Sequence, residues 1–499
     1  MKPERKGKKL PIGWLLAAFV CFTLAVMIMV VLEWYMKAFD TSLAGLLFTV
    51  TIPQKGTGAS AVMEPLKILL PRMLMWIGGF LLLLILLRVE FLWRGKAAAF
   101  RRGAEKVLVT FGILSFIAAP VYGFFRLDGP DYLRRVRAQT RIYEEEYVSP
   151  NEIALKAPEE RPNLISLYLE SMETTYASVS DGGRQSVNYM PELTRLSREN
   201  ISFSNTDRLG GIHSTDNTNW TMAALFAGTS GLPFAFPVQQ NSMNKYTSFA
   251  AEAVTLGDIL AREGYTQEFL CGSDGEYGGR ALYFREHGGY EIYDLWKARE
   301  NGDIPSDYYV WWGFEDLKLF EIAKKELTRL YEAGQPFNLT ILTVDAHHLG
   351  GYVCEACGTE YADKTANVIA CTDRQVAAFV DWCRQQPFWD QTVMVINGDH
   401  PRMDTCLTEG VPFQERTIYN CFLNARKQPL GEVNFRSSTM MDLYPTTLSA
   451  MGFEIAGNRL GLGTDLFSGE KTLAERMGYE ALNDEVQKYS QFFLDHFTR

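Results

Sequence analysis

The chain has 499 residues, of which 47% are hydrophobic, 13% aromatic and 22% charged, and its formal net charge is -10. This length favours more than one domain, and this apolar content excludes a disordered chain and a small disulfide-held scaffold. A nucleic-acid partner is disfavoured, because phosphate backbones are held by a surplus of Lys and Arg that the chain lacks. We therefore expect a folded, multi-domain protein with no nucleic-acid partner.

Three long apolar segments lie in the first quarter of the chain, at Gly13 to Leu32, Ile68 to Leu87 and Val107 to Phe125. Each has about the 20 residues that a helix needs to cross the hydrocarbon core of a bilayer. The first is too long for a signal peptide and has no small-residue cleavage site after it. Residues 43–53 are apolar but too short to span, which favours an interfacial or re-entrant segment and leaves a fourth span as an alternative. Residues 1–127 are thus predicted to form a membrane domain with three, or at most four, transmembrane helices.

Positive charge is distributed unevenly around these segments. Basic residues gather before the first span and between the second and third, at Lys2, Arg5, Lys6, Lys8, Lys9, Arg88, Arg94, Lys96, Arg101, Arg102 and Lys106. The positive-inside rule places both stretches in the cytoplasm. We therefore predict a multi-pass protein of the cell membrane, with a juxtamembrane linker at 128–162 and an extracytoplasmic domain at 163–499.

The sequence after Pro162 alternates short apolar runs with stretches of helical periodicity. Leu164 to Leu169, Phe337 to Val344 and Thr392 to Ile396 are typical of buried strands. Helical spacing is found at Met190 to Arg198, Thr255 to Glu263, Glu315 to Ala333, Asp373 to Gln386 and Met440 to Met451. The pattern predicts an α/β domain with a mostly parallel sheet, in which ligands bind at the carboxyl ends of the strands.

Polar residues follow the predicted strands. Glu170 comes directly after the first strand, and Asp399 and His400 come shortly after the third. The loop 210–231 is rich in glycine and hydroxyl side chains and leads into an apolar helix. Each feature alone has a structural explanation, such as capping of a helix. Together they predict an oxygen-rich metal site with an alcohol nucleophile at a helix N-terminus, which suits phosphoryl transfer.

Four segments carry a resemblance to a known family. They are N-L-I-S-L-Y-L-E-S at 163–171, T-N-W-T-M-A-A-L-F-A-G at 218–228, V-D-A-H-H at 344–348 and N-G-D-H-P at 397–401. In this order, and behind a membrane anchor, they resemble the sulfatase-type phosphoglycerol transferases, which include lipoteichoic acid synthases and the enzymes that decorate periplasmic glucans. The resemblance implies an alkaline-phosphatase-like or sulfatase-like fold for the outer domain.

The resemblance also implies roles for particular residues. The implied metal ligands are Glu170, Asp399 and His400, together with a nucleophilic threonine. Thr218 is our choice, because its segment runs in register with the sulfatase signature that starts at the nucleophile and ends in glycine ten positions later. Thr215 and Thr221 stay open as alternatives. Since threonine cannot become the formylglycine of true sulfatases, hydrolysis of sulfate esters is disfavoured.

Two further residues resemble substrate contacts of that family. His347 corresponds to a histidine that contacts the phosphoglycerol group and acts as acid or base, although a histidine at a strand end is often structural. Arg280 corresponds to an arginine that binds substrate, and a guanidinium suits phosphate. Gly278 stands where the family has a tryptophan, and an ordinary ion pair is the alternative role for this arginine.

The activity that the resemblance implies is transfer of glycerol phosphate from phosphatidylglycerol, through a threonine-linked intermediate, to an extracytoplasmic glycan, glycolipid or polyglycerolphosphate. The cofactor is a divalent metal, with Mn²⁺ favoured and Zn²⁺ or Mg²⁺ as alternatives. Phosphoethanolamine transfer and phosphodiester hydrolysis are alternatives of the same fold. A membrane sensor without catalytic activity is the alternative of another class.

Eight cysteines are present, one of them, Cys21, in the first apolar segment. The other seven are an odd number, so they cannot all pair within the chain, and at least one thiol is free or forms an intermolecular bond. Cys354, Cys357 and Cys371 lie close together in sequence, just after His347. A disulfide is favoured there in an oxidising compartment, because the group lacks the fourth ligand of a zinc ribbon.

Overall fold

The computed structural model describes residues 10–38, 43, 46–47, 59–89, 97–238, 240–348 and 350–498. The chain divides into two compact units. One comprises Met1–Arg137 with Pro237–Ser242, and the other comprises Ala138–Phe236 with Met243–Arg499.

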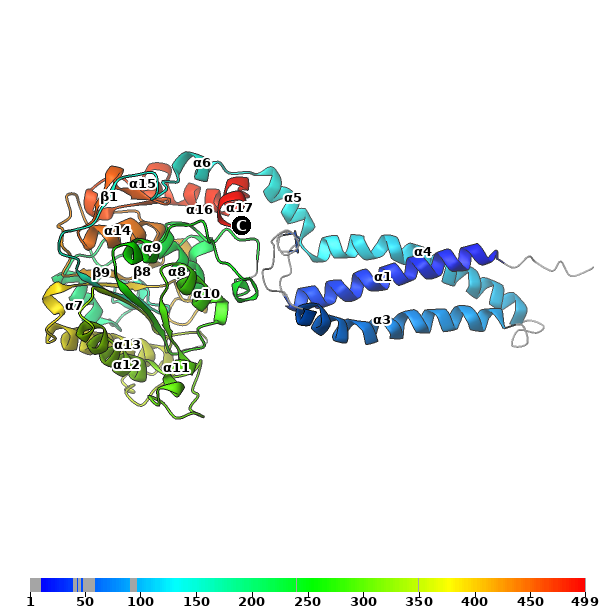
Figure 1. Cartoon of the computed structure of the whole chain (residues 1–499), viewed down its shortest axis with the longest axis horizontal. Helices are drawn as coiled ribbons and strands as arrows, with labels where there is room; N and C mark the ends of the chain where they lie inside the picture. The colour runs from blue at the N-terminus through cyan, green and yellow to red at the C-terminus, as the bar shows by residue number, and fades with distance from the viewer. Residues whose placement is uncertain are drawn as a thin grey trace, which may run out of the picture. The chain divides into compact units, whose positions relative to one another are not determined.

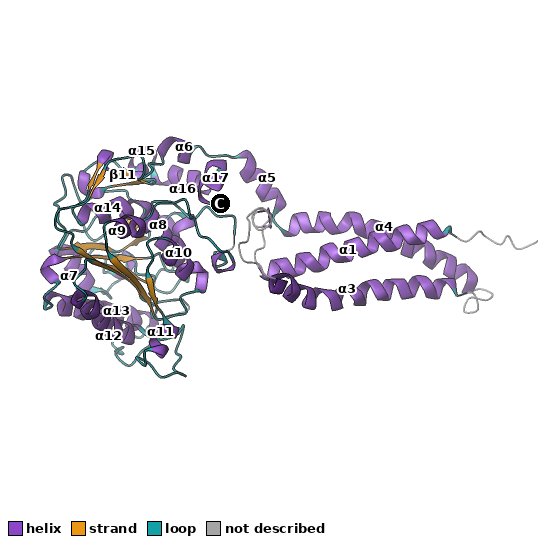
Figure 2. Cartoon of the chain, in the orientation of Figure 1, coloured by secondary structure: helices purple, strands orange, loops and turns teal. Residues whose placement is uncertain are grey.

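The first unit is helical in its described part (Figure 2). Its helices are α1 (Ile12–Ala38), α3 (Ala59–Arg88), α4 (Ala97–Arg126) and α5 (Gly129–Arg137). The described residues include three stretches long and apolar enough to cross a membrane, Ile12–Met36, Leu69–Arg88 and Phe100–Arg126. The three predicted apolar helices are thus confirmed. Of the segment expected to be interfacial, only Leu43, Leu46 and Leu47 are among the described residues.

Close packing joins α1 to its two neighbours. The ring of Phe22 on α1 stacks on that of Phe80 on α3, with 4.1 Å between centroids. A Cβ on Gly112 of α4 would lie 2.7 Å from the carbonyl oxygen of Ala18, so only glycine permits this approach of α4 to α1. An ion pair of 2.6 Å between Arg88 and the buried Glu105 connects α3 to α4.

The second unit is built on a six-stranded sheet of order β5-β4-β6-β2-β7-β9. Every neighbouring pair is parallel except β7 and β9. The strands are β2 (Asn163–Leu169), β4 (Thr266–Cys271), β5 (Glu291–Tyr293), β6 (Phe337–Leu342), β7 (Thr392–Gly398) and β9 (Asn420–Leu423). Short pairs outside the sheet are β1 (Leu155–Lys156) with β10 (Glu454–Ile455), β3 (Ile212–His213) with β8 (Thr417–Ile418), and β11 (Arg459–Leu460) with β12 (Gly463–Thr464).

Helices cover both faces of the sheet (Figure 1). One face carries α7 (Pro191–Glu199), α12 (Asp316–Glu332) and α13 (Lys364–Arg384), and the other carries α8 (Thr221–Ser230), α9 (Leu256–Arg262) and α14 (Leu443–Ala450). The remaining helices are α6 (Ile142–Glu146), α10 (Arg280–Glu286), α11 (Leu295–Glu300), α15 (Leu473–Met477), α16 (Tyr479–Gln487) and α17 (Gln491–Phe497). The predicted α/β class with a mostly parallel sheet is confirmed.

The two faces of β2 pack differently. Ile165, Leu167 and Leu169 are fully buried in a core that also contains side chains of α7, α12 and α13. Tyr168 points to the opposite face, where α8 passes so closely that a Cβ on Gly228 would lie 2.8 Å from its hydroxyl. Glycine at this position therefore sets how near α8 can come to the carboxyl end of β2.

Some elements differ from the expectation. The helix predicted from Asp373 begins at Lys364, where the Asp363 side chain accepts hydrogen bonds from the first amides. Strand β4 was not among the predicted strands, because Gln267 and Glu268 interrupt its apolar pattern. Glu268 is nevertheless buried, since Arg329 of α12 pairs with it. Residues 138–162, expected as a linker, lie within the second compact unit, where Tyr143 is buried.

Candidate metal centre

Two neighbouring strands end side by side at the centre of the sheet. Leu169 of β2 is paired with Gly398 of β7, so the residues that follow, Glu170 and Asp399, emerge next to each other. The ligating atoms of Glu170, Asp399 and His400 lie within 4.8 Å of one another, and all three residues are buried. Nε2 of His400 is 3.7 Å from Oε1 of Glu170 and 3.4 Å from Oδ2 of Asp399. These three residues can hold a metal ion, as their sequence positions predicted.

Hydrogen bonds orient the three side chains. The Ser171 hydroxyl donates to Oε1 of Glu170 at 2.7 Å, and the Ser171 amide donates to Oδ1 of Asp399 at 2.8 Å. Ser171 has a φ of 54°, a left-handed conformation that a non-glycine residue keeps only where its surroundings enforce it. Nδ1 of His400 lies 2.9 Å from the Pro401 carbonyl, which can only accept, so Nδ1 carries a proton and Nε2 is free to bind a metal.

The electrostatics of the cluster fit a cation. Burial and the neighbouring Glu170 raise the pKa of Asp399 to about 7. Among the described residues, Oδ2 of Asp399 is buried and has no hydrogen-bond partner. An unpartnered buried carboxylate oxygen is costly, and a divalent cation would compensate it. Two carboxylates and an imidazole suit zinc or manganese.

The structure brings Thr221, not Thr218, to these ligands. The Thr221 hydroxyl lies 3.3 Å from Oε2 of Glu170 and 3.4 Å from Nε2 of His400. Thr221 is the first residue of α8, so its hydroxyl lies beside the unpaired amides of a helix N-terminus.

Thr218 lies in the preceding turn, and its side chain is engaged there. Its hydroxyl accepts a hydrogen bond of 2.9 Å from the Thr215 amide in a capping box, and the residue is fully buried. Thr215 is its partner in that box. The difference of three residues reflects a short 3-10 turn, Asp216–Thr218, which precedes α8 and which the apolar pattern does not reveal.

His347 lies in the loop after β6, the strand on the other side of β2. Its ring stacks on that of His348, with 4.2 Å between centroids, and lies 4.8 Å from the ring of Trp312. Both histidines are close enough to Glu170 for their charge to act against burial and lower the pKa of that carboxyl. Nδ1 of His347 is 2.7 Å from the His348 carbonyl, which can only accept, so Nδ1 carries a proton. A role of His347 as acid or base stays a prediction.

Arg280 is buried at the start of α10, and its side chain is hydrogen-bonded to residues of the loop that precedes this helix. The guanidinium donates to the carbonyls of Tyr277 and Asp274 at 3.0 and 2.7 Å, and to the Ser273 hydroxyl at 3.0 Å. Its guanidinium carbon also lies 5.6 Å from the centroid of the Tyr277 ring. A role in substrate binding for Arg280 stays a prediction.

A buried ionic network next to the centre was not foreseen. Arg402, two residues after His400, is 1% exposed, donates to the Ala346 carbonyl at 2.6 Å and pairs with Asp404 at 2.8 Å. Its backbone amide donates to Glu173, and Glu173 also pairs with Arg416. The network thereby connects the segment of the metal ligands to the loop of His347. Its sign in the sequence is the pair of charged residues, Arg402 and Asp404, close behind Asp399 and His400.

The domain has a mostly parallel sheet, and its strand ends gather carboxylates and an imidazole beside the hydroxyl at a helix N-terminus. This arrangement defines an alkaline-phosphatase-like domain. The Sulfatase family model matches residues 162–453, more than half of the chain. The chain therefore belongs to the sulfatase family.

Individual proteins are similar to parts of this chain. Phosphoglycerol transferase I of Escherichia coli O127:H6 is 29% identical over 358 residues, which cover 68% of this chain and 45% of that protein. The matched region thus spans less than half of this relative. An alkaline phosphatase superfamily protein from Vibrio parahaemolyticus has a similar structure, with a TM-score of 0.50, 20% identity and coverage of 66% and 76% of the two chains. The lipoteichoic acid synthase LtaP of Listeria monocytogenes has a TM-score of 0.48 at 18% identity, with coverage of 63% and 79%.

Proposed function

We propose that this protein is a membrane-anchored, metal-dependent phosphoglycerol transferase that uses Thr221 as its nucleophile. The observation that carries the proposal is the position of the Thr221 hydroxyl, 3.3 Å from Glu170 and 3.4 Å from His400 at the N-terminus of α8. The relationship to phosphoglycerol transferase I supports the choice of transferred group. Thr218, the first choice from the sequence, is engaged in its capping box and is replaced in this role by Thr221.

The proposed reaction has two steps. The Thr221 hydroxyl releases its proton to solvent and its oxygen attacks the phosphorus of phosphatidylglycerol. The bond from phosphorus to the diacylglycerol oxygen breaks, and diacylglycerol leaves as an alcohol. A hydroxyl of the acceptor then attacks the glycerophosphoryl-threonine and frees Thr221. Nε2 of His347 donates the proton to the leaving oxygen and takes one from the acceptor. The amides at the start of α8 face the charge that develops on the phosphoryl oxygens.

Glu170, Asp399 and His400 would hold the metal, which lowers the pKa of a bound hydroxyl and offsets phosphoryl charge when present. Manganese is our choice, with zinc or magnesium as alternatives, since two carboxylates and one imidazole accept all three.

The proposed location follows from the three apolar helices and the distribution of positive charge. With the segment before α1 and the one between α3 and α4 in the cytoplasm, the second unit lies on the extracytoplasmic side. The donor lipid is then a component of the membrane that anchors the enzyme. The acceptor is an extracytoplasmic hydroxyl of a glycan, glycolipid or polyglycerolphosphate chain.

The test is peptide mass spectrometry of the full chain in detergent after incubation with phosphatidylglycerol and manganese. We expect a glycerophosphoryl adduct on Thr221 in the wild type and in Thr218→Ala, and none in Thr221→Ala. An adduct on Thr218 would restore the register expected from the sequence. An adduct formed only from phosphatidylethanolamine would assign phosphoethanolamine transfer. Release of glycerol phosphate without an acceptor would assign a hydrolase, and inactivity with either lipid in metal-loaded protein would favour the non-catalytic sensor.

A further inference from the structure

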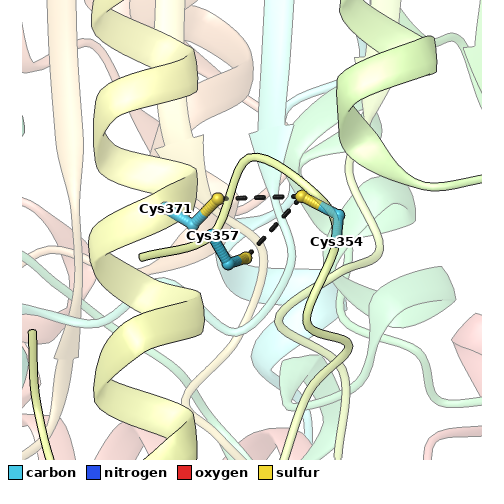
Figure 3. A group of neighbouring side chains, drawn as sticks. All are labelled: Cys354, Cys357 and Cys371. Carbon is cyan, nitrogen blue, oxygen red and sulfur yellow. Dashed lines mark hydrogen bonds between the residues drawn. The ribbon is translucent and has the colours of Figure 1, made fainter. Parts of the chain in front are cut away.

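A second group of ligand atoms lies in the loop between β6 and α13. The sulfur of Cys354 is 3.6 Å from that of Cys357 and 3.8 Å from that of Cys371, which projects from α13 (Figure 3). All three sulfurs lie within 4.8 Å of one another. Four-coordinate zinc holds sulfurs at about 2.3 Å, which separates two tetrahedral sulfurs by about 3.8 Å. All cysteines among the described residues are free, so the disulfide expected here is not formed.

The backbone around Cys354 is arranged to stabilise a thiolate. The amides of Ala356 and Cys357 donate hydrogen bonds to the Cys354 sulfur. Nε2 of Gln375, one turn beyond Cys371 on α13, donates to the Cys371 sulfur at 3.2 Å and lies 3.9 Å from that of Cys354. Hydrogen bonds of this kind favour sulfur that carries negative charge. They give the sulfurs of Cys354 and Cys371 the outer support that thiolate ligands of a metal have.

A buried acidic side chain, Asp345, lies near Cys354. Asp345 is 1% exposed, and neither of its oxygens has a hydrogen-bond partner among the described residues. A cation bound at the sulfurs would compensate this carboxylate too.

We propose that Cys354, Cys357 and Cys371 bind one zinc ion through three thiolate sulfurs, with a water molecule in the fourth position. Soft thiolates select zinc over manganese or magnesium, so this site takes a different kind of ligand set from the one at Glu170. Binding releases the protons of the three thiols to solvent. No oxidation is involved.

The site has a structural role for the loop of His347. The chain from Thr343 to Asp363 has no helix or strand in its described part, and it carries both His347 and the first two cysteines. The third cysteine belongs to the rigid α13. Zinc therefore connects the loop to the helix, and its binding free energy becomes stabilisation of the loop.

The test measures the number of zinc ions per chain in a variant whose candidate metal centre at Glu170 and Asp399 has been removed. The full chain carrying Glu170→Gln and Asp399→Asn is produced with zinc, purified under thiol-protecting conditions and analysed by inductively coupled plasma mass spectrometry. We expect one zinc per chain. Adding Cys354→Ser and Cys371→Ser should remove it. Adding Cys383→Ser instead, a buried cysteine of the same helix outside the cluster, should leave one zinc in place.

Cobalt substitution covers the case in which the serine variants fail to fold. Cobalt bound to thiolates gives a sulfur-to-metal charge-transfer absorption that oxygen and nitrogen ligands do not give. This absorption can therefore be measured in the cobalt-loaded wild-type protein, without any cysteine variant. Its presence supports the proposal, and its absence overturns it. A disulfide between two of these cysteines, found by mass spectrometry after alkylation at harvest, would overturn it as well.

Discussion

The backbone amide of Ser171 donates a hydrogen bond of 2.8 Å to Oδ1 of Asp399. This contact joins the ends of β2 and β7, because Ser171 follows Glu170 on one strand and Asp399 follows the other. The Ser171 hydroxyl simultaneously orients Glu170. One residue in a left-handed conformation thus positions two of the three candidate metal ligands.

Replacing Ser171 by Ala should weaken metal binding without removing a ligand. The amide bond to Asp399 stays, but the hydroxyl that holds Glu170 is lost. Loss of such an outer-sphere contact typically reduces metal affinity by roughly 10- to 100-fold. Titration of the metal-free protein with manganese, followed by calorimetry, measures this. The control is Ser180→Ala, because the Ser180 hydroxyl is hydrogen-bonded to the Ser178 hydroxyl and not to a candidate metal ligand. Equal metal affinities for the two variants would contradict the role of Ser171.

Replacing His347 by Gln should lower transfer activity by roughly 10²-fold or more, because a positioned acid and base is lost. Metal content should stay the same, since His347 is not among the three clustered ligands. His348→Gln, which removes the ring stacked on it, should have a smaller effect. Turnover of fluorescent phosphatidylglycerol and metal analysis of the same preparations decide this. If the two variants were equally active, proton transfer would need another residue.

Replacing Arg402 by Met should destabilise the second unit by about 3–5 kcal/mol, because Asp404 would remain half of a broken buried pair. The bond that holds the Ala346 carbonyl would be lost as well, so the loop of His347 should become more mobile. Chemical denaturation followed by tryptophan fluorescence gives the loss.

Arg184 is the matched control for this change. It pairs with Glu415 at the surface, with both side chains about half exposed, so Arg184→Met should cost roughly 1 kcal/mol or less. Similar losses for the two arginine variants would show that the Arg402 network contributes no more than a surface pair.

Asp442 should make the stability of the second unit depend on pH. Burial raises the pKa of Asp442 to about 6 from its ordinary 3.8. Between these values the folded protein keeps a proton that the unfolded chain has released. The stabilisation is therefore complete below pH 3.8 and is lost as the pH rises through about 6, by at most about 3 kcal/mol.

Asp442→Asn removes this contribution. The free energy of unfolding, measured between pH 4 and 6.5, should fall less steeply with pH than in the wild type. The substitution also leaves one of the amides that donate to the Asp442 carboxylate without its acceptor, so the variant should be less stable throughout. Asp207→Asn, at a side chain that is 67% exposed, should keep the wild-type slope. A wild-type slope in Asp442→Asn would refute the assignment.

The sequence alone determined the features that depend on local pattern. Long apolar runs predicted the three helices of the first unit, and short apolar runs predicted β2, β6 and β7. Because parallel strands end at one edge of a sheet, Glu170 and the Asp399-His400 pair could be expected together. These inferences need only the period of the pattern and the direction of the strands.

Only the tertiary structure decided which side chains meet. The 3-10 turn before α8 sets which threonine reaches Glu170, and a hydroxyl pattern with Thr215, Thr218 and Thr221 in one loop is compatible with each choice. Cys371 meets Cys354 because α13 begins earlier than its pattern indicates. Such contacts depend on backbone turns and on residues distant in sequence, which local propensity and periodicity do not encode.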